Sequence, residues 1–206
     1  MNVRGALLLA LALALTGCTG SLLESSADAP ETYRLAGEAF ADRGERLPLA
    51  LAVARPRAAP ALDTERIAVV RTDSRFDYFV GVRWSEPAPQ MLQQMLVRGL
   101  AADGRFEAVV AAPSRVPVDL LLDVELRRFE AVYPSDAAAP EVRTELQVSV
   151  VDPRQGRRLA SFGAAGSAVA TENRRAAVVD AFERATAAAV REAVSGVREA
   201  VSSTPR

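Results

Sequence analysis

Alternating apolar and polar residues dominate the second half of the chain and predict long β-strands. Between residues 117 and 133 the apolar positions are even up to Leu126 and odd from Phe129. This alternation is typical of a half-buried strand, and the change of parity at Arg128 predicts a β-bulge that returns the aromatic residues to the core side. Residues 141–152 and 158–169 continue the pattern on either side of a polar turn. The three segments predict an antiparallel meander.

Helical spacing appears in two segments. Residues 86–103 have one apolar face, with Ser85 as the expected N-cap, Pro87 in the first turn and Gly104 as the C-terminal cap. Residues 173–202 repeat small and apolar side chains at helical intervals, with Arg and Glu on the opposite side. This second segment predicts a long C-terminal helix whose small-residue face packs on the sheet.

Shorter apolar runs predict the remaining strands. They lie near Tyr33 and over residues 47–56, 66–72, 76–84 and 106–112, with Gly81 as a candidate hairpin turn. The expected fold class is α/β (α+β): one antiparallel or mixed sheet with a mid-chain helix and a long C-terminal helix packed on it.

The N-terminus has the pattern of an export signal. One basic residue, Arg4, precedes an apolar run from Ala6 to Leu15. A run of this length is too short to span a bilayer, which needs about 20 apolar residues. A basic start followed by such a run is typical of a secretory signal peptide.

Leu15, Thr16, Gly17 and Cys18 then resemble the lipobox of bacterial lipoproteins. The small residues Thr16 and Gly17 allow a peptidase to approach the bond before Cys18, which is the only cysteine of the chain and supplies the thiol for a diacylglycerol thioether. An ordinary secretory signal that ends near a free thiol is the alternative. Two acyl chains suffice for stable anchoring in a membrane.

The expected organisation follows from this cleavage site: a signal peptide over 1–17, a lipidated N-terminus and tether over 18–30, a single domain over 31–201 and a tail over 202–206. Thr19 follows the lipidated cysteine where enterobacterial lipoproteins retained at the inner membrane have an aspartate. We therefore expect a lipid-anchored protein at the outer membrane, facing the periplasm. An inner-membrane location is the alternative, because this sorting rule weakens outside those bacteria.

Composition removes several classes of function. The chain has 206 residues and a formal charge of −1, and its 25 basic residues are all arginine. Such a balance argues against binding to nucleic acid. Without His or Lys there is no Ser-His-Asp triad, imidazole metal ligand, Schiff base or phosphate-loop lysine. We expect no enzyme activity, no cofactor and no metal site.

Three sequence features could indicate a chemical function, but an ordinary role in packing or solvation explains each of them better. Asp123 and Glu125 lie about 7 Å apart along a strand, a spacing that an inverting carboxylate pair permits. However, an alternating strand needs a polar outer face, on which Arg127 neutralises them. Gly163 and Gly166 indicate a strand packed closely under a helix. The Arg174-Arg175 pair is either a contact to lipid head groups or, more simply, the polar start of a helix.

Aromatic residues mark the one candidate contact surface. Tyr78 and Phe79 are adjacent, so on a strand they face opposite sides and at least one ring needs a partner surface or solvent. Trp84 precedes a helix and either joins them or fills the sheet edge. We take Tyr78, Phe79 and Trp84 as candidate partner or lipid contacts.

Four segments together resemble a known family: the lipobox, "YRL" at Tyr33–Leu35, "ALDTERIAV" at Ala61–Val69 and "VRWSEPAPQMLQQML" at Val82–Leu96. In the last of them Arg-Trp, a polar residue, an acid and a proline precede an amphipathic helix. The chain resembles the ABC-type transport auxiliary lipoprotein family, which includes Pqi-type outer-membrane lipoproteins.

The resemblance implies an accessory of an MCE-type lipid transport system. Its expected partners are an MCE-domain protein with its ABC permease and ATPase, with lipid as a further candidate and homo-oligomerisation left open. No enzymatic residues come with the family. The alternative is a structural lipoprotein that supports outer-membrane or secretion-complex assembly.

Overall fold

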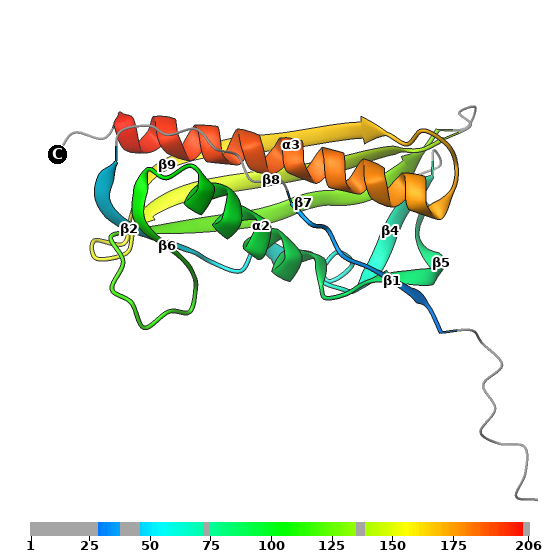
Figure 1. Cartoon of the computed structure of the whole chain (residues 1–206), viewed down its shortest axis with the longest axis horizontal. Helices are drawn as coiled ribbons and strands as arrows, with labels where there is room; N and C mark the ends of the chain where they lie inside the picture. Colours follow the sequence, from blue (N-terminus) through cyan, green and yellow to red (C-terminus); the bar gives the residue numbers. More distant parts are fainter. Residues whose placement is uncertain (1–28, 38–45, 72–74, 135–138, 204–206) are drawn as a thin grey trace, which may run out of the picture.

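A single mixed sheet carries two helices on one of its faces. The computed structural model describes residues 29–37, 46–71, 75–134 and 139–203, and Figure 1 shows α3 and α2 side by side in front of the sheet. The strands are β1 (Glu31–Tyr33), β2 (Leu47–Val53), β3 (Arg57–Ala58), β4 (Arg66–Arg71), β5 (Phe76–Trp84), β6 (Phe106–Ala111), β7 (Leu120–Tyr133), β8 (Glu141–Asp152) and β9 (Arg157–Val169). The helices are α2 (Ala88–Ala102) and α3 (Arg175–Ser202). The predicted fold class is confirmed.

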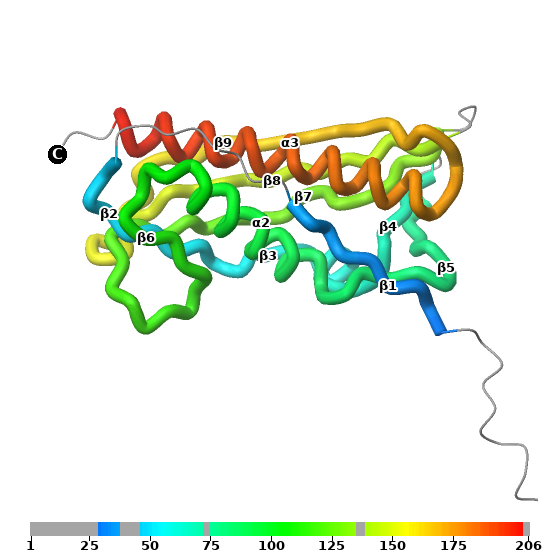
Figure 2. The backbone as a smooth tube through the Cα atoms, viewed as in Figure 1, coloured from blue at the N-terminus to red at the C-terminus, as the bar shows by residue number. Residues whose placement is uncertain are grey.

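Strand β7 is the centre of the sheet. One of its edges pairs in parallel with β2, β3 and β4 in succession, and the other pairs antiparallel with β8 along almost its whole length. Strand β9 then pairs antiparallel with β8, which confirms the predicted meander. Beyond these strands, β5 and β1 extend the sheet from β4, and β6 extends it from β2. The tube in Figure 2 shows β7, β8 and β9 running alongside α3.

The predicted bulge in β7 is present. Its register with β8 shifts between Leu126 and Arg128. As a result Leu126 and Phe129, on either side of the shift, are both buried, while Arg127 and Arg128 are exposed. Without an extra residue there, the two-residue period of a strand would turn Phe129 to the open face of the sheet.

Helix α2 begins two residues later than predicted. Ser85 is not its N-cap, because the Ser85 amide donates to the Tyr33 carbonyl oxygen at 2.7 Å and so continues the pairing of β5 with β1. Pro87 takes the capping position, with no side-chain capping bond. Gly104 closes the other end at a φ of 70°, as expected for a C-terminal cap.

The prediction of a hairpin turn at Gly81 is wrong. Strand β5 is continuous from Phe76 to Trp84, and its pairing with β4 shifts between Arg66 and Ala68. Gly81, at a φ of 73°, lies within this bulge. The glycine that suggested a turn instead lets three extra residues of β5 loop out between paired positions, and this leaves the Val80 side chain 85% exposed.

Helix α3 approaches the sheet closely through small residues. Its buried face includes Ala177, Ala181, Ala185, Ala189 and Ala193. A Cβ atom on Gly166 of β9 would lie 2.1 Å from the Ala185 carbonyl oxygen and 2.8 Å from the Ala189 nitrogen. The helix backbone therefore rests directly on the strand, as the small-residue pattern predicts.

We predict that Gly166→Ala destabilises the fold by about 2–3 kcal/mol, because the new methyl group meets helix backbone that has no rotamer to move into. Urea unfolding followed by circular dichroism measures the change. Gly163→Ala on the same strand is the matched control, since its Cβ would be 3.9 Å from the nearest atom, the Leu146 carbonyl oxygen, and removing a strand glycine is mildly favourable. Equal stability of the two variants would contradict the close packing.

Candidate functional site

The two adjacent aromatic residues of β5 point to opposite sides of the sheet, as predicted. The Tyr78 ring lies on the face away from the helices, under the Arg66 guanidinium at 3.6 Å, and its hydroxyl donates to the Ala61 carbonyl oxygen at 3.1 Å. The Phe79 ring packs edge-on against Tyr133 beside the first turns of α3. Both rings are half-buried, so each offers only part of its surface to a partner.

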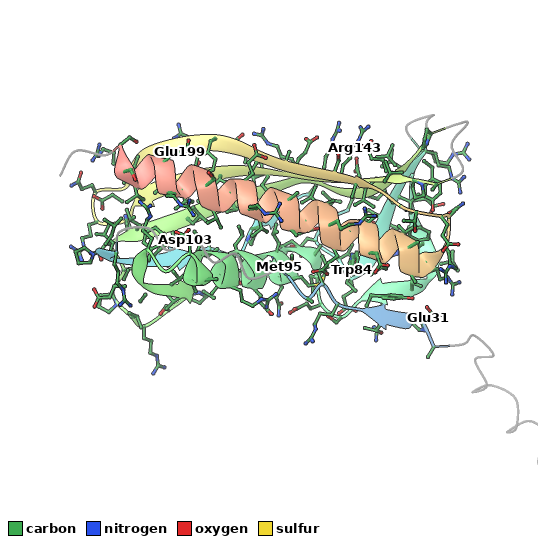
Figure 3. The ribbon with its side chains drawn as sticks, turned by 45° about the horizontal axis from the view of Figure 1, so that its top comes forward. Glu31, Trp84, Met95, Asp103, Arg143 and Glu199 are labelled. Carbon is green, nitrogen blue, oxygen red and sulfur yellow. The ribbon has the colours of Figure 1, made fainter. Side chains whose placement is uncertain are left out.

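Trp84, the third candidate contact, lies in the core. Its side chain is 0% exposed and packs against Phe129 and Phe182, with ring centroids 5.6 and 5.1 Å away. Figure 3 shows it beneath α3. The contact role is therefore corrected: a buried ring that joins β5, β7 and α3 has no surface to offer a partner. Its Nε1 is buried with no acceptor among the described residues. An unpaired buried donor of this kind lowers the stability of the fold.

The predicted lipidation site, Leu15, Thr16, Gly17 and Cys18, lies outside the described residues and stays a prediction. Among the residues that are described, no helix is both long and apolar enough to cross a bilayer. The first described residues that bear on anchoring are therefore those where the chain enters the domain.

That entry is a short segment, residues 31–37, which we call the strap. Strand β1 pairs in parallel with β5, and the Leu35 side chain after it is buried. Glu183 of α3 accepts hydrogen bonds from the Ala36 and Gly37 amides at 2.9 and 2.7 Å. Arg98 of α2 donates to the Ala36 carbonyl oxygen at 3.0 Å.

Both helices thus hold the strap by charged side chains on its backbone, and hydrogen bonds to charged groups are stronger than neutral ones. Gly37 has a φ of 71°, so the chain turns there in a conformation that other residues rarely adopt. Sequence reasoning did not identify Glu183 or Arg98, because each is one of many charged residues on a helix. Only the fold brings them to residues about 60 and 150 positions away in the chain.

A second charged cluster joins the far ends of the helices. Asp103 is the C-cap residue of α2, and its carboxylate, which is 2% exposed, pairs with Arg198 of α3. Arg105 lies 4.0 Å from the same carboxylate and donates to the Ser202 hydroxyl at 3.2 Å. Removing one partner of such a buried pair costs far more than removing an exposed one, so this cluster fixes the two helices against each other.

The sheet face opposite the helices, which we call the open face, carries the acidic residues considered for catalysis. Asp123 pairs with Arg57 at 3.2 Å and Glu125 with Arg127 at 3.6 Å. Asp119 accepts from the Ala50 amide at 2.9 Å and pairs with Arg154 at 3.0 Å. Each carboxylate is thus neutralised by its own arginine, the arrangement of a solvated face and not of an acid-base pair.

One carboxyl group on the open face differs from these. Burial raises the pKa of Glu130 above its ordinary value, and the nearby Glu145 adds to this effect while Arg128 and Arg143 oppose it. By contrast, the Arg143 guanidinium, which donates to Glu141, lowers the pKa of Glu141. Burial also raises the pKa of Tyr133 at the end of β7. None of these groups faces a nucleophile or an enclosed cavity in the described part of the chain.

The described residues contain no group of three or more His, Cys, Asp or Glu side chains placed to hold a metal ion. Concave regions are shallow. One lies between the strap and α2, lined by residues that include Arg34, Glu86 and Arg98, and another follows β9 beside the second half of α3. The described residues offer exposed surfaces and, at the strap, a fixed point where the chain enters the domain.

The sequence and the fold of the chain are both similar to those of known proteins. The model of a family described as the ABC-type transport auxiliary lipoprotein component matches residues 33–194. A crystal structure of protein XCC0632 from Xanthomonas campestris, of the DUF330 family, is similar with a TM-score of 0.77 and 26% identity, over 83% of this chain and 96% of that one. No curated protein is a significant match to the sequence.

Two further solved structures share the fold alone. One is an uncharacterised protein with a TM-score of 0.59 and 16% identity, covering 84% of this chain and 99% of that chain. The other is the hypothetical protein CT253 from Chlamydia trachomatis, with a TM-score of 0.53 and 11% identity over 77% and 100% of the two chains.

We predict that Glu183→Ala loosens the strap and costs about 1–2 kcal/mol, since it removes the acceptor of two amides. Hydrogen exchange followed by NMR is expected to show that the Ala36 and Gly37 amides exchange faster in the variant than in the wild type, whereas the amides of β7 exchange at the same rate in both. Asp180→Ala, an exposed acidic residue one turn earlier on α3, is the matched control. Unchanged exchange at Ala36 and Gly37 would mean that β1 pairing alone holds the strap.

A second prediction concerns Glu130. Because its pKa is raised in the folded state, the native protein binds more protons than the unfolded chain between the two pKa values, and stability falls as the pH rises through that window. We expect Glu130→Gln to be more stable than the wild type at neutral pH and to lose this advantage below the ordinary pKa of glutamate.

Thermal unfolding at a series of pH values tests the effect. Glu125→Gln on the same strand is the control, because the Glu125 side chain is 45% exposed against 15% for Glu130. We expect that control to change stability at neutral pH by no more than about 0.5 kcal/mol. A constant difference between Glu130→Gln and the wild type across the pH range would contradict the prediction.

Proposed function

The chain belongs to the family of ABC-type transport auxiliary lipoprotein components, and from this premise we propose that it is the lipid-anchored, periplasm-facing auxiliary component of an MCE-type lipid transport system. In this proposal Cys18 carries the acyl anchor in the outer membrane. The folded domain docks the MCE substrate-binding protein, which works with an ABC permease and ATPase. The family match over residues 33–194 is the observation that carries the proposal.

The way the chain enters the domain supports an anchoring role. A load applied through the acyl chains reaches the domain at the strap, where β1 pairing, Glu183 and Arg98 hold the backbone. These contacts connect the strap to the sheet and to both helices. A partner docked elsewhere on the domain would therefore stay within reach of the membrane, at the end of the tether.

The middle of the open face is the surface we assign to the protein partner. The helices leave it uncovered, and its charges are paired locally by exposed bridges such as Arg128 to Glu145 at 3.4 Å. Along β9 the outward residues there are small, namely Ser161, Gly163 and Ala165. A flat, nearly neutral face with small side chains allows close approach of another protein without burying unpaired charge.

We predict that the tagged, acylated protein recovers an MCE-domain protein together with its permease and ATPase from gently solubilised envelopes. Gly163→Arg places a long side chain on the open face, where a Cβ meets no atom closer than 3.9 Å, and is expected to reduce recovery about tenfold, equivalent to about 1.4 kcal/mol. Quantitative mass spectrometry of the bound proteins measures both results.

Glu199→Arg, an arginine introduced on the exposed side of α3, is the matched control and should recover as much partner as the wild type. Cys18→Ser tests the anchor in the same experiment, because the variant should lose its acyl chains and leave the outer-membrane fraction. Recovery of assembly or secretion components without an MCE protein would overturn the transport role in favour of a structural lipoprotein.

A further inference from the structure

An apolar row crosses the open face at one end of the sheet. Paired positions join Phe76 to Val70, Val70 to Val132, Val132 to Glu141 and Glu141 to Val169. Four of the five residues are apolar. Phe76 and Val169, at the two ends of the row, are 40% and 60% exposed and are among the most exposed large hydrophobic residues of the described chain.

The strands beside this row are basic and aromatic. Phe76 packs edge-on against Tyr78 with ring centroids 5.3 Å apart, and Arg66 lies over the Tyr78 ring. Arg71 is the last residue of β4, and Arg75 immediately precedes β5. From Glu65 to Trp84 the sequence has four arginines against three acidic residues, and Glu65 pairs with Arg83 at 3.2 Å, which leaves a small local excess of positive charge in a chain whose total is −1.

The chain enters the domain toward the same end. Because β1 is parallel to β5, with Glu31 opposite Val82, residues before Glu31 lead back along β5 toward Phe76. Figure 1 shows β1 beside β5 at this end, and Figure 3 shows Glu31 there with Asp103 and Glu199 toward the other end. Arg175 at the start of α3 adds a link, since it lies 3.4 Å from both the Glu31 carboxylate and the Val80 carbonyl oxygen.

Chain length limits which end can meet the membrane. The eleven peptide units between Cys18 and the first described residue, Ala29, span at most about 38 Å when fully extended. The two ends of the sheet are about 40 Å apart, because β7 runs from Leu120 at the other end to Val132 in the row at 3.3 Å per residue. The Cys18 anchor therefore reaches the bilayer most easily when the end with the apolar row lies nearest the membrane.

We infer that the apolar row Phe76, Val70, Val132 and Val169, with Arg66 and Arg75 beside it, is a membrane-contact surface that rests on an anionic lipid headgroup layer. This inference rests on the proposed anchor at Cys18 and adds the orientation of the domain. Exposed apolar and aromatic side chains enter the headgroup region, while arginines beside them contact lipid phosphates. The rest of the open face then stands away from the membrane.

The row suits a lipid surface better than a second copy of the chain. Like-charged arginines at each copy would meet across a symmetric contact, which is unfavourable, whereas anionic head groups complement them. The row is also narrow: Glu141, the one polar residue within it, forms an ion pair at 2.7 Å with Arg143, the next residue of β8 on the open face. An interfacial layer needs only such a line of side chains, because the acyl anchor provides most of the binding.

The test uses the full acylated protein in vesicles of phosphatidylethanolamine and phosphatidylglycerol. Since the thiol of Cys18, the only cysteine, is acylated, an introduced cysteine is the one labelling site. Val169→Cys and Ser161→Cys lie eight residues apart on the same face of β9, and each receives an environment-sensitive NBD dye. We expect a blue shift of the emission at Val169→Cys, with quenching by headgroup-nitroxide lipids, and neither effect at Ser161→Cys.

Two variants of the Val169→Cys protein sharpen the result. Phe76→Asp should abolish the blue shift, whereas Val116→Asp, at an exposed apolar residue outside the row, should keep it. Vesicle flotation distinguishes failure of the proposed Cys18 anchor from failure of the proposed membrane contact. A protein that floats with equal dye signals at both positions keeps its anchor and overturns the membrane contact, and a protein that fails to float overturns the anchor and the contact with it. Dye self-quenching that grows with protein density, without nitroxide quenching, would assign the row to a second copy instead.

Discussion

The domain depends on keeping one face of strand β7 turned toward the helices along all of its 14 residues. Its apolar residues change parity near Arg127 and Arg128, so a regular strand would bury one half and expose the other. The bulge between Leu126 and Arg128 removes this conflict and leaves the two arginines in solvent. It also places Phe129 where it meets Trp84 and Phe182, which joins β5 and α3 to the centre of the sheet.

The edge of the sheet is the second constraint, because an exposed edge strand is a template for aggregation. Helix α3 covers part of the edge of β9 with its own side chains. Glu192 accepts from the Ala165 amide at 2.7 Å, and Arg184 donates to the Val169 carbonyl oxygen at 2.9 Å. These bonds require the helix to run close beside the strand, and Gly166 is what allows that closeness. The small residues of α3 thus serve both packing and protection of the edge.

Most of the fold was predictable from the sequence because its signals are local. The alternation in β7, β8 and β9, the parity change at Arg128 and the helical spacing of α2 and α3 are all confirmed. The failures have tertiary causes. Ser85 looks like a helix cap, but β1, which is distant in sequence, uses its amide to extend the sheet. The positive φ of Gly81 serves a bulge and not a turn.

The candidate site was less predictable than the fold. Tyr78 and Phe79 face opposite sides as alternation requires, but nothing local distinguishes a surface tryptophan from Trp84, which is buried only because Phe129 and Phe182 come to meet it. The strap was invisible for the same reason, since Glu183 and Arg98 act on the backbone of a distant segment. Likewise, the apolar row exists only when five strands are aligned, because it takes a single residue from each.

The distribution of charge differs between the middle of the open face and its β4–β5 end. Along the middle, the acids that might have indicated catalysis are held by neighbouring arginines, as Asp123 is by Arg57 and Glu125 by Arg127. Such exposed pairs add little stability, but they leave that region without a strong field. The β4–β5 pair differs, because its arginines outnumber its aspartates. A balanced middle suits a protein and a basic, aromatic end suits anionic lipid, so the same open face can meet both when the strap fixes which end lies nearest the anchor.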